Sequence, residues 1–510
     1  MRIPFPNRIH PWHAGIFAGI ICAIQLIEGT PIYWAFGIFI YIMTATFAFN
    51  LVGGMYRASG AYIVANAILA VILGQCAKIL LREPAQSNLR DPETTILVYV
   101  AGMGVILFAA LISRRLILKV PLLERGTTST NMRQIGMGCA VLAIILYEFG
   151  DLLGTENGSV GSALRQFNMW LPLAIILIVY QTIKESGGRR SITPVSLGLI
   201  LYATYIGVLG ASKQGIFTGP VAYLVVCIAM RFRFRLIHML VLLPIAAVLV
   251  FYMVPYSQVV RNYVRYAKTT EEARTIAWQW LSHPQDLLSA YSEIKSADSD
   301  AIGTIHYFDN SEGFMDRLTM VAVDDALIDI TDRGNVFGFW PTLFGLENVV
   351  PHFVWKDKPT IGFGNIYAHD LDILSDEDTT TGISFSAMAD AYHQGKWLGI
   401  LILYPFLLII LFSAADSLTG DIRISPWGFA YTVYFLHIGP EGDCGSLIYS
   451  AFYTSFILIT TVYTARFAMP VIGAFLAPEK RSVLLTRKPQ SIPRSAGFST
   501  VSRFRSGTSE

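Results

Sequence analysis

Residues 32–52 read IYWAFGIFIYIMTATFAFNLV, a continuous apolar stretch with no charged side chain. A helix needs about 20 mostly apolar residues to cross the hydrocarbon core of a bilayer, so this stretch predicts a transmembrane helix. The whole 510-residue chain shares the same bias, with 53% hydrophobic and only 15% charged residues and a mean hydropathy of +0.50. Because soluble domains carry about 25% charged residues, this composition indicates a polytopic membrane protein.

Apolar runs of this kind recur along the chain. They cover residues 14–28, 32–52, 59–80, 95–113, 134–150, 167–183, 193–210, 214–230, 236–254, 397–414, 427–440 and 447–468. No small-residue cleavage site follows the first run, so we expect a membrane helix there rather than a removed signal peptide. The predicted fold class is an all-α polytopic membrane protein with about 12 transmembrane helices and one large external loop.

The spacing of the runs divides the chain into four parts. We expect an N-terminal transmembrane region of about nine spans at 1–254, a large loop with short helices at 255–396, a C-terminal transmembrane region of about three spans at 397–470, and a basic tail at 471–510. The tail is rich in serine and poor in apolar residues, which predicts disorder. Residues 256–396 hold ten Lys/Arg against twenty-one Asp/Glu.

Basic side chains gather in alternate connections between the runs. The basic connections are 114–133, 184–190 and 231–235. Because short loops rich in Lys and Arg stay in the cytoplasm, this pattern places both termini inside and the 255–396 loop outside. The 81–93 connection fits less well, since it carries Arg82 and Arg90 on the predicted outer side.

The sequence shows no metal or disulfide framework. Its five cysteines lie far apart, without CxxC or Cys/His spacing. The acidic run SDED at 375–378 lacks the ligand spacing of a calcium loop, so we interpret it as a solvated surface. We therefore expect neither a metal nor a cofactor.

Two parts of the loop carry cations at helical spacing. In SQVVRNYVRYAK (257–268), Arg261, Arg265 and Lys268 would share one helix face near the outer membrane surface. They could bind a ligand or simply anchor the helix end. In GFMDRLTMVAVDDALIDITDRG (313–334), the pattern predicts a helix that stops near Gly334. Arg317 on this helix could reach a substrate or pair with the nearby aspartates.

The stretch PHFVWKDKPTIGFG (351–364) predicts a nearly extended strip, since its two prolines fix backbone angles and disfavour helix at the preceding residue. Lys356 and Lys358 could face a ligand or be solvated turn charges. Gly362 and Gly364 would allow a close backbone approach.

Further acidic and histidine side chains lie near the predicted outer surface. In TTTGISFSAMADAYHQGKWLGI (379–400), Asp390, His393 and Lys396 follow one another at three-residue steps just before the tenth run. Near the outer end of the eleventh run, His437, Glu441 and Asp443 could line a cavity.

Taken together, these stretches resemble the bacterial O-antigen and exopolysaccharide repeat-unit polymerases of the Wzy type. LGASKQGIFTGPVAYLVV (209–226) is similar to the Ser-Arg/Lys element of that family, with Lys213 where many relatives have arginine. Trp355 to Pro359 is similar to the family's proline–aromatic–Lys-Pro strip. The Thr-rich stretch before Asp390 and the late external loop complete the resemblance, which spans about 200–399.

The resemblance implies a reaction and a location. The protein would transfer a growing glycan from undecaprenyl pyrophosphate to a sugar hydroxyl of the next lipid-linked repeat unit, at the outer face of the bacterial inner membrane. The fold would be related to the membrane folds of lipid-sugar glycosyltransferases and O-antigen ligases. The implied partners are undecaprenyl-pyrophosphate-linked oligosaccharides, membrane lipid, and possible chain-length regulator and flippase proteins, with no nucleic acid.

This reaction needs cations for the leaving pyrophosphate and a base for the acceptor hydroxyl. The candidate pyrophosphate ligands are Lys213, Arg261, Arg265, Arg317, Lys356 and Lys358, and the candidate bases are Asp390 and His393. The donor is already activated, so no nucleotide is required.

Other functions stay open at this stage. A lipid-linked oligosaccharide flippase or transporter would suit the number of spans, but coupled carriers usually keep charged residues inside the membrane and show repeat symmetry. An O-antigen ligase would differ from a polymerase only in its acceptor. A non-catalytic scaffold would leave the cationic positions unexplained.

Overall fold

The computed structural model describes residues 1–124, 132–150, 164, 169–265, 267, 270–300, 305–309, 319–351, 354–355, 357–359, 361–374, 377–378 and 381–476, with only the backbone at 262, 265, 270 and 294–300. The structure is 76% helix, and no strand occurs in the described residues. The all-helical prediction is therefore confirmed. Residues 471–476 of the tail predicted to be disordered are instead helical, at the end of the helix Met469–Leu476, and the tail beyond residue 476 lies outside the described residues.

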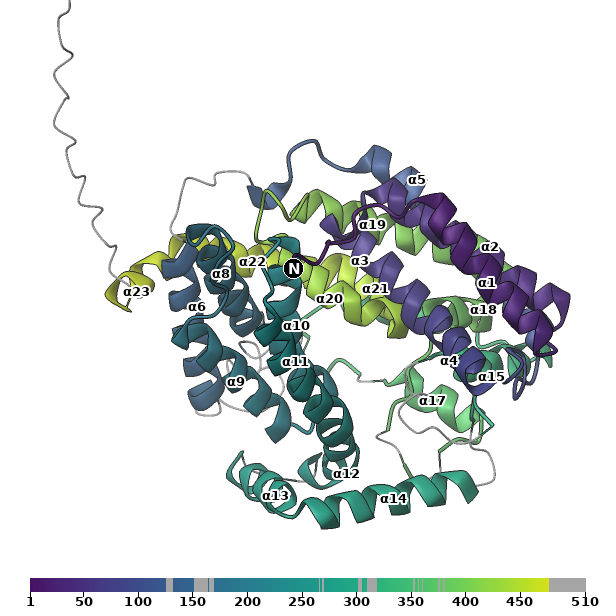
Figure 1. The fold of residues 1–510 in the computed structure, drawn as a ribbon. Helices are drawn as coiled ribbons and strands as arrows, with labels where there is room; N and C mark the ends of the chain where they lie inside the picture. The colour runs from purple at the N-terminus through teal and green to yellow at the C-terminus, as the bar shows by residue number, and fades with distance from the viewer. Residues whose placement is uncertain are drawn as a thin grey trace, which may run out of the picture.

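The N-terminal region consists of helices that match the predicted runs. They are α1 (Pro11–Ile27), α2 (Ile32–Val52), α3 (Ala58–Ala65) continuing through η2 (Asn66–Ile72) into α4 (Leu73–Leu81), α5 (Pro92–Leu116), α6 (Met132–Phe149), α8 (Trp170–Glu185), α9 (Pro194–Leu209), α10 (Lys213–Ala229), and α11 (Leu236–Val248) continuing through η5 (Leu249–Met253) into α12 (Val254–Arg265). α1 to α5 lie on one flank and α6, α8 and α9 on the other (Figure 1).

The remaining helices build the predicted loop and the C-terminal region. They are α13 (Thr270–Ser282), α14 (Pro284–Asp300), α15 (Val321–Asp332), α16 (Trp340–Glu347), α17 (Phe363–Asp370), α18 (Ala387–Leu398) continuing through η6 (Gly399–Leu403) into α19 (Tyr404–Thr419), α20 (Gly428–Glu441), α21 (Cys444–Tyr449) continuing through η7 (Ser450–Thr454) into α22 (Ser455–Phe467), and α23 (Met469–Leu476).

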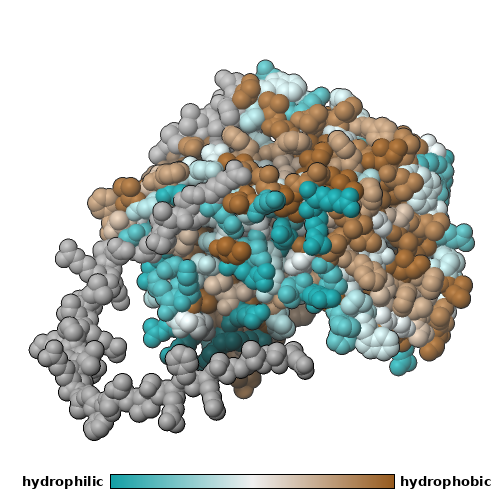
Figure 2. All heavy atoms as spheres, turned by 90° about the horizontal axis from the view of Figure 1, so that it is seen from above, coloured by the Kyte–Doolittle hydropathy of each residue, from teal (hydrophilic) through white to brown (hydrophobic). Residues whose placement is uncertain are grey.

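Seven helices in the described residues are both long and apolar enough to cross a membrane. They are Ile32–Val52, Ala58–Leu81, Pro92–Leu116, Met132–Phe149, Leu236–Arg261, Ala387–Thr419 and Cys444–Phe467. Pro11–Ile27, Pro194–Leu209 and Lys213–Ala229 are shorter apolar helices. Hydrophobic side chains cover much of the molecular surface in Figure 2, with hydrophilic ones gathered between them. This surface suits a helical membrane protein, whereas the count of twelve spans stays a prediction.

The helix connections alternate between two ends of the bundle. At one end, the Met1 amino group donates to the Phe234 carbonyl at 2.6 Å, and the Arg233 N–H donates to the Gly188 carbonyl at 3.2 Å. At the other end, the Ala85 N–H donates to the Gln25 side chain at 2.9 Å. The first end therefore collects the N-terminus and basic connections, and the second end collects the 81–91 connection and the long 255–396 segment. We call the second end the loop end.

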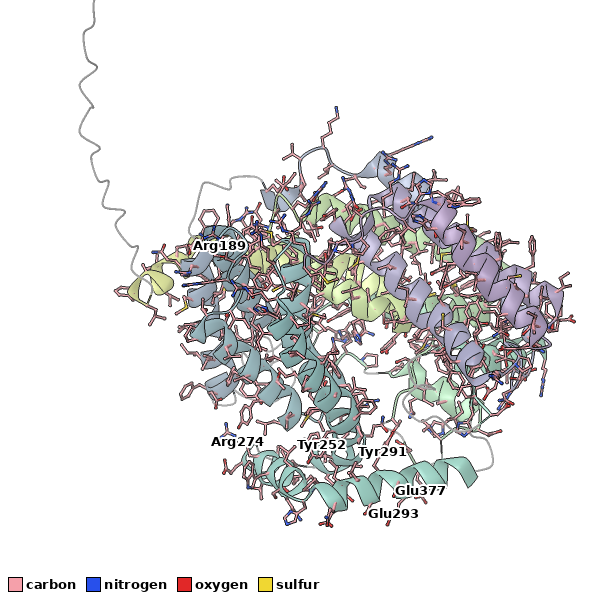
Figure 3. The ribbon with its side chains drawn as sticks, in the orientation of Figure 1. Arg189, Tyr252, Arg274, Tyr291, Glu293 and Glu377 are labelled. Atoms are coloured by element: carbon pink, nitrogen blue, oxygen red, sulfur yellow. The ribbon has the colours of Figure 1, made fainter. Side chains whose placement is uncertain are left out.

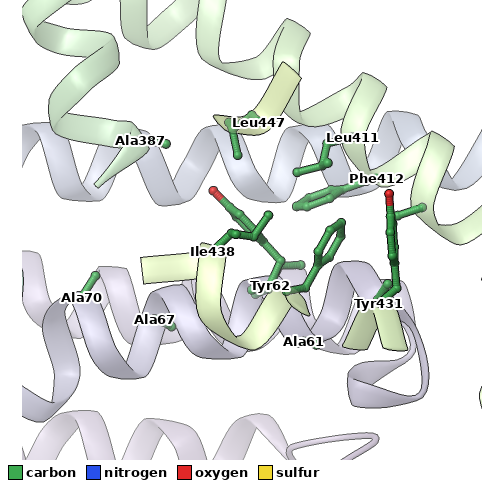
Figure 4. Packing of buried hydrophobic residues seen from close by; sticks show 14 of the residues in the cluster. Ala61, Tyr62, Ala67, Ala70, Ala387, Leu411, Phe412, Tyr431, Ile438 and Leu447 are labelled. Carbon is green, nitrogen blue, oxygen red and sulfur yellow. The ribbon is translucent and has the colours of Figure 1, made fainter. Parts of the chain in front are cut away.

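Aromatic and aliphatic side chains fill the centre of the bundle between these ends. Tyr62 is fully buried and lies among Ile438, Leu447 and Phe412, its ring centroid 5.5 Å from that of Phe412 (Figure 4). These residues come from α3, α19, α20 and α21, so the core joins the N-terminal and C-terminal regions. The two predicted transmembrane regions thus share one core.

The described parts of the 255–396 segment pack against helices of the N-terminal region. Arg274 on α13 pairs with Glu148 on α6 at 3.0 Å, at the left of Figure 3. The Tyr252 hydroxyl donates to the Leu281 carbonyl at 3.3 Å, which joins η5 to the end of α13. Such contacts hold α13 and α14 at the loop end, where α14 runs along the edge of the molecule in Figure 1.

Three local predictions need correction. The helix predicted at 313–334 begins only at Val321 among the described residues, although its end is confirmed, since Asp332 is its last residue and Gly334 has a φ of +111°. The strip at 351–364 is not extended at its start, because two N–H groups, those of Val354 and Trp355, donate to the Pro351 carbonyl and close a turn.

The tenth run is also longer than predicted. Its helix begins at Ala387 and breaks at Gly395 and Lys396, where Lys396 has a φ of +49°. The predicted loop boundary at 396 therefore falls inside a bent helix, and Asp390 and His393 lie on that helix rather than in a loop.

Candidate functional site

A cavity of 430 Å³ lies at the loop end, between the 255–396 segment and the connection from α20 to α21. Aromatic rings line it, together with two carboxylates; these residues are Phe344, Phe363, Tyr367, Phe385, Tyr449, Glu441 and Asp443. The prediction that Glu441 and Asp443 line a cavity is confirmed. No lysine or arginine is among its lining residues in the described part of the chain.

Close backbone contacts shape the walls of this cavity. A Cβ at Gly345 on α16 would lie 2.5 Å from the Cα of Gly445 on α21, so the two helices touch through glycine. A Cβ at Gly364 would lie 2.2 Å from the Ile383 carbonyl oxygen, which confirms the predicted close approach there. At Gly362 the nearest such atom, on Asn365, is 3.9 Å away, so that glycine is not required for space.

Asp390 lies beneath the cavity and is fully buried. One of its carboxylate oxygens accepts from the Tyr367 hydroxyl at 2.9 Å, and the other accepts from the Gln394 amide at 2.9 Å and from the Cys444 N–H at 2.8 Å. Asp390 thereby joins α17, α18 and α21. Burial, and next the negative charge of Asp390, raise the pKa of Tyr367, so its phenol stays protonated and donates.

Asp443 differs from Asp390 in having an oxygen available. Its Oδ1 accepts from the Ser446 N–H at 2.6 Å and caps α21. The other oxygen, Oδ2, has no hydrogen-bond partner in the described residues, and the side chain is half-buried at the cavity wall. Glu441 is exposed at the same wall, 4.0 Å from the Nδ1 of His437, and His437 itself does not line the cavity.

His393 is buried next to this site but does not line the cavity. Its Nδ1 lies 2.8 Å from the Thr331 hydroxyl oxygen, and that hydroxyl donates to the Leu327 carbonyl at 2.6 Å. Since a hydroxyl has a single proton to donate, the Nδ1 of His393 must carry the hydrogen. The His393 ring packs edge-on against Tyr367, with centroids 4.7 Å apart.

Lys358 occupies a structural position behind the cavity wall. Its ammonium donates to the carbonyls of Asn348 at 3.2 Å and Val350 at 2.9 Å, and only 8% of the residue is exposed. Burial lowers the pKa of Lys358. The lysine is thus engaged with the backbone, while Asn348 itself faces the cavity.

Two further predicted cations, Lys213 and Arg261, do not line the cavity. Lys213 begins α10 and is half-buried, and Arg261 is exposed on α12. These two helices share a small apolar cluster that includes Ile216, Tyr256 and Val260, so Lys213 and Arg261 lie in one region of the loop end. Arg317 and Lys356 lie outside the described residues, as does the side chain of Arg265. None of the predicted cations whose side chains are described lines the cavity.

A second cavity of 330 Å³ lies where α15 meets the 81–91 connection, and Arg90 lines it. Asp325 also lines it and accepts from the N–H groups of Arg90 and Asp91 and from the Thr95 hydroxyl. Burial raises the pKa of Asp325 to about 6, although these donors oppose the shift. This carboxylate attaches α15 to the start of α5.

Two of these residues, Arg90 and Tyr367, were not predicted as site residues from the sequence. Arg90 stood out only because it breaks the rule that basic loops lie on the cytoplasmic side. That exception was a usable signal, since a cation on the predicted outer side suggests a specific role there. Tyr367 gave no signal, since its role depends on Asp390 lying opposite.

No group of three or more potential metal ligands occurs among the described residues. Compared with protein-family models, with curated proteins and with solved structures, the chain matches none.

Proposed function

We propose that this protein transfers a glycan from a polyprenyl pyrophosphate to a sugar hydroxyl, as a repeat-unit polymerase. The observation that carries the proposal is the loop-end cavity lined by aromatic rings and two carboxylates. Sugars present hydroxyls that donate to carboxylates and apolar ring faces that pack on aromatic side chains. The volume of 430 Å³ lies in the range of small-molecule sites.

The charge of the cavity decides which substrate it would hold. A pyrophosphate carries negative charge and would be repelled by Glu441 and Asp443, whereas an acceptor hydroxyl would be attracted. We therefore assign the cavity to the acceptor sugar. The pyrophosphate of the donor is assigned to the cations predicted from the sequence, namely Lys213, Arg261, Arg265, Arg317 and Lys356, with Arg90 added and Lys358 removed.

We further propose twelve spans, with the loop end on the outer side of the bacterial inner membrane and both termini in the cytoplasm. The alternation of connections between two ends supports this arrangement, as does the gathering of Arg189, Arg190, Arg231, Arg233 and Arg235 at the end opposite the loop end.

A deletion strain provides the direct test. We expect lipid carriers bearing single repeats to accumulate on the outer side, because the units are delivered but not joined. Accumulation on the inner side would favour a flippase instead, and a normal glycan length profile would contradict the proposal.

The matching test in vitro uses those accumulated lipid-linked units with the purified protein in lipid nanodiscs. We expect chains to lengthen without added nucleotide, and the Arg265→Ala, Arg317→Ala double variant to lose at least 100-fold in rate, because developing charge on the pyrophosphate loses its donors. Elongation by that variant at the normal rate would contradict the pyrophosphate assignment.

A further inference from the structure

We propose that Asp443 takes the proton from the acceptor hydroxyl and that Asp390 beneath it is a positioning residue. This inference rests on the proposed function. It differs from the sequence-based expectation, which placed the base at Asp390 or His393.

The hydrogen bonds separate the three candidates. Both oxygens of Asp390 already accept, from three donors in all, and the residue is fully buried. His393 lies outside the cavity lining, with its protonated nitrogen engaged by Thr331. Asp443 alone among them combines a place on the cavity wall with an oxygen that has no partner in the described residues.

The local backbone fixes the direction of Asp443. Its Oδ1 is held by the Ser446 N–H at 2.6 Å, and the next residue, Cys444, donates its N–H to Asp390 at 2.8 Å. Asp390 therefore holds the turn that presents Asp443. The preceding Gly442 is also required, because a Cβ there would lie 2.6 Å from the Ile438 carbonyl oxygen.

The transfer needs no reactant other than the donor and the acceptor. The acceptor oxygen attacks the anomeric carbon of the donor glycan while the bond from that carbon to the pyrophosphate oxygen breaks. The bonding electron pair leaves with the polyprenyl pyrophosphate, a new glycosidic bond forms, and the hydroxyl proton passes to the Oδ2 of Asp443. General-base assistance of this kind contributes typically about 10²–10⁴-fold in rate.

The test compares Asp443→Asn with Asp370→Asn, which removes one carboxylate charge from an exposed residue at the end of α17, outside the cavity lining. Both are assayed in nanodiscs with lipid-linked repeat units from the deletion strain. Asparagine is as good a helix cap as aspartate, so we expect Asp443→Asn to fold. We expect its kcat to fall at least 100-fold with little change in KM, while Asp370→Asn keeps kcat within about threefold.

A conservative variant separates positioning from mere stability. The amide oxygen of Asp390→Asn can still accept from the Cys444 N–H, whereas Asp390→Ala loses that contact. We therefore expect Asp390→Ala to lose more kcat than Asp390→Asn at equal yields of folded protein, with little change in KM for either. Equal kcat values for the two variants would contradict the positioning role.

The outcomes are distinguishable. If wild type elongates and Asp443→Asn does so at a similar rate, this inference is wrong while the proposed function stands. If wild type does not elongate these units, the proposed function fails first. Should Asp443→Asn not fold, Asp443→Ser also keeps a cap for Ser446, and its wild-type turnover would equally overturn the assignment.

Discussion

Lys358 shows how a residue's surroundings decide its role. Since it follows Lys356 and Asp357 and precedes Pro359, it looks like a solvated or ligand-facing cation. In the structure its ammonium donates hydrogen bonds to the backbone carbonyls of Asn348 and Val350, so the lysine closes the turn that follows α16. A buried ammonium needs such partners, because leaving it unsolvated and unpaired is costly.

Replacing Lys358 tests this structural role. We expect Lys358→Met to lower the free energy of unfolding by about 1–3 kcal/mol, because two buried carbonyls lose a charged donor. Thermal unfolding in detergent would detect the loss, with Lys119→Met, exposed at the opposite end, as the control. Elongation per folded molecule should stay within about twofold of wild type. Unchanged stability with a loss of rate beyond 100-fold would return Lys358 to the pyrophosphate ligands.

Asp390 and His393 show what spacing could and could not predict at this scale. The sequence put them three residues apart in a predicted loop, whereas both lie on α18 and close together around Tyr367. Their burial was not predictable, because it depends on α15 and α17 covering that side. Spacing also could not reveal that Asp390 would find three donors.

At the scale of elements, two glycines of the same strip make a matched pair. Gly364 lies in the first turn of α17 against the Ile383 carbonyl, whereas a Cβ at Gly362, just before the helix, would meet only the Asn365 Cβ at 3.9 Å. Neither residue has a positive φ. The two glycines therefore differ in the space that is available for an added methyl group.

We expect Gly364→Ala to destabilise the protein by about 1–3 kcal/mol, because the methyl group would push against backbone that cannot rotate away. Gly362→Ala should change stability by less than about 1 kcal/mol in either direction. Thermal unfolding of both variants in the same detergent checks the contrast. Equal thermal midpoints for the two variants would mean that the backbone near Gly364 shifts to accommodate the methyl group more easily than these contacts indicate.

Helix ends were less predictable than helix positions. Each apolar run marked a helix, because hydrophobic length is a local property of the sequence. The start of α18 at Ala387 and its break at Gly395 and Lys396 were missed. The first half of that helix is polar enough to look like a loop, and only its contacts with neighbouring helices hold it in place.

At the scale of the whole molecule, the two-ended arrangement predicts accessibility from each side of the membrane. Arg115 lies at the end with the N-terminus, and Ser292 lies on α14 at the loop end, both exposed. In a variant lacking the native cysteines, we expect Ser292→Cys in intact spheroplasts to react with a membrane-impermeant maleimide. Arg115→Cys should react only after the membrane is opened. Labelling of both from the same side would contradict the arrangement.

The sequence by itself determined that the chain is helical, where most helices lie, and that a large acidic segment separates two apolar regions. These features follow from composition and hydropathy along short stretches of chain. Only the tertiary structure decided which polar groups meet. Asp325 accepts from the Arg90 N–H across 235 positions, and Asp390 accepts from the Cys444 N–H across 54. A buried carboxylate is stable only where donors from distant segments converge on it, and no local pattern encodes that convergence.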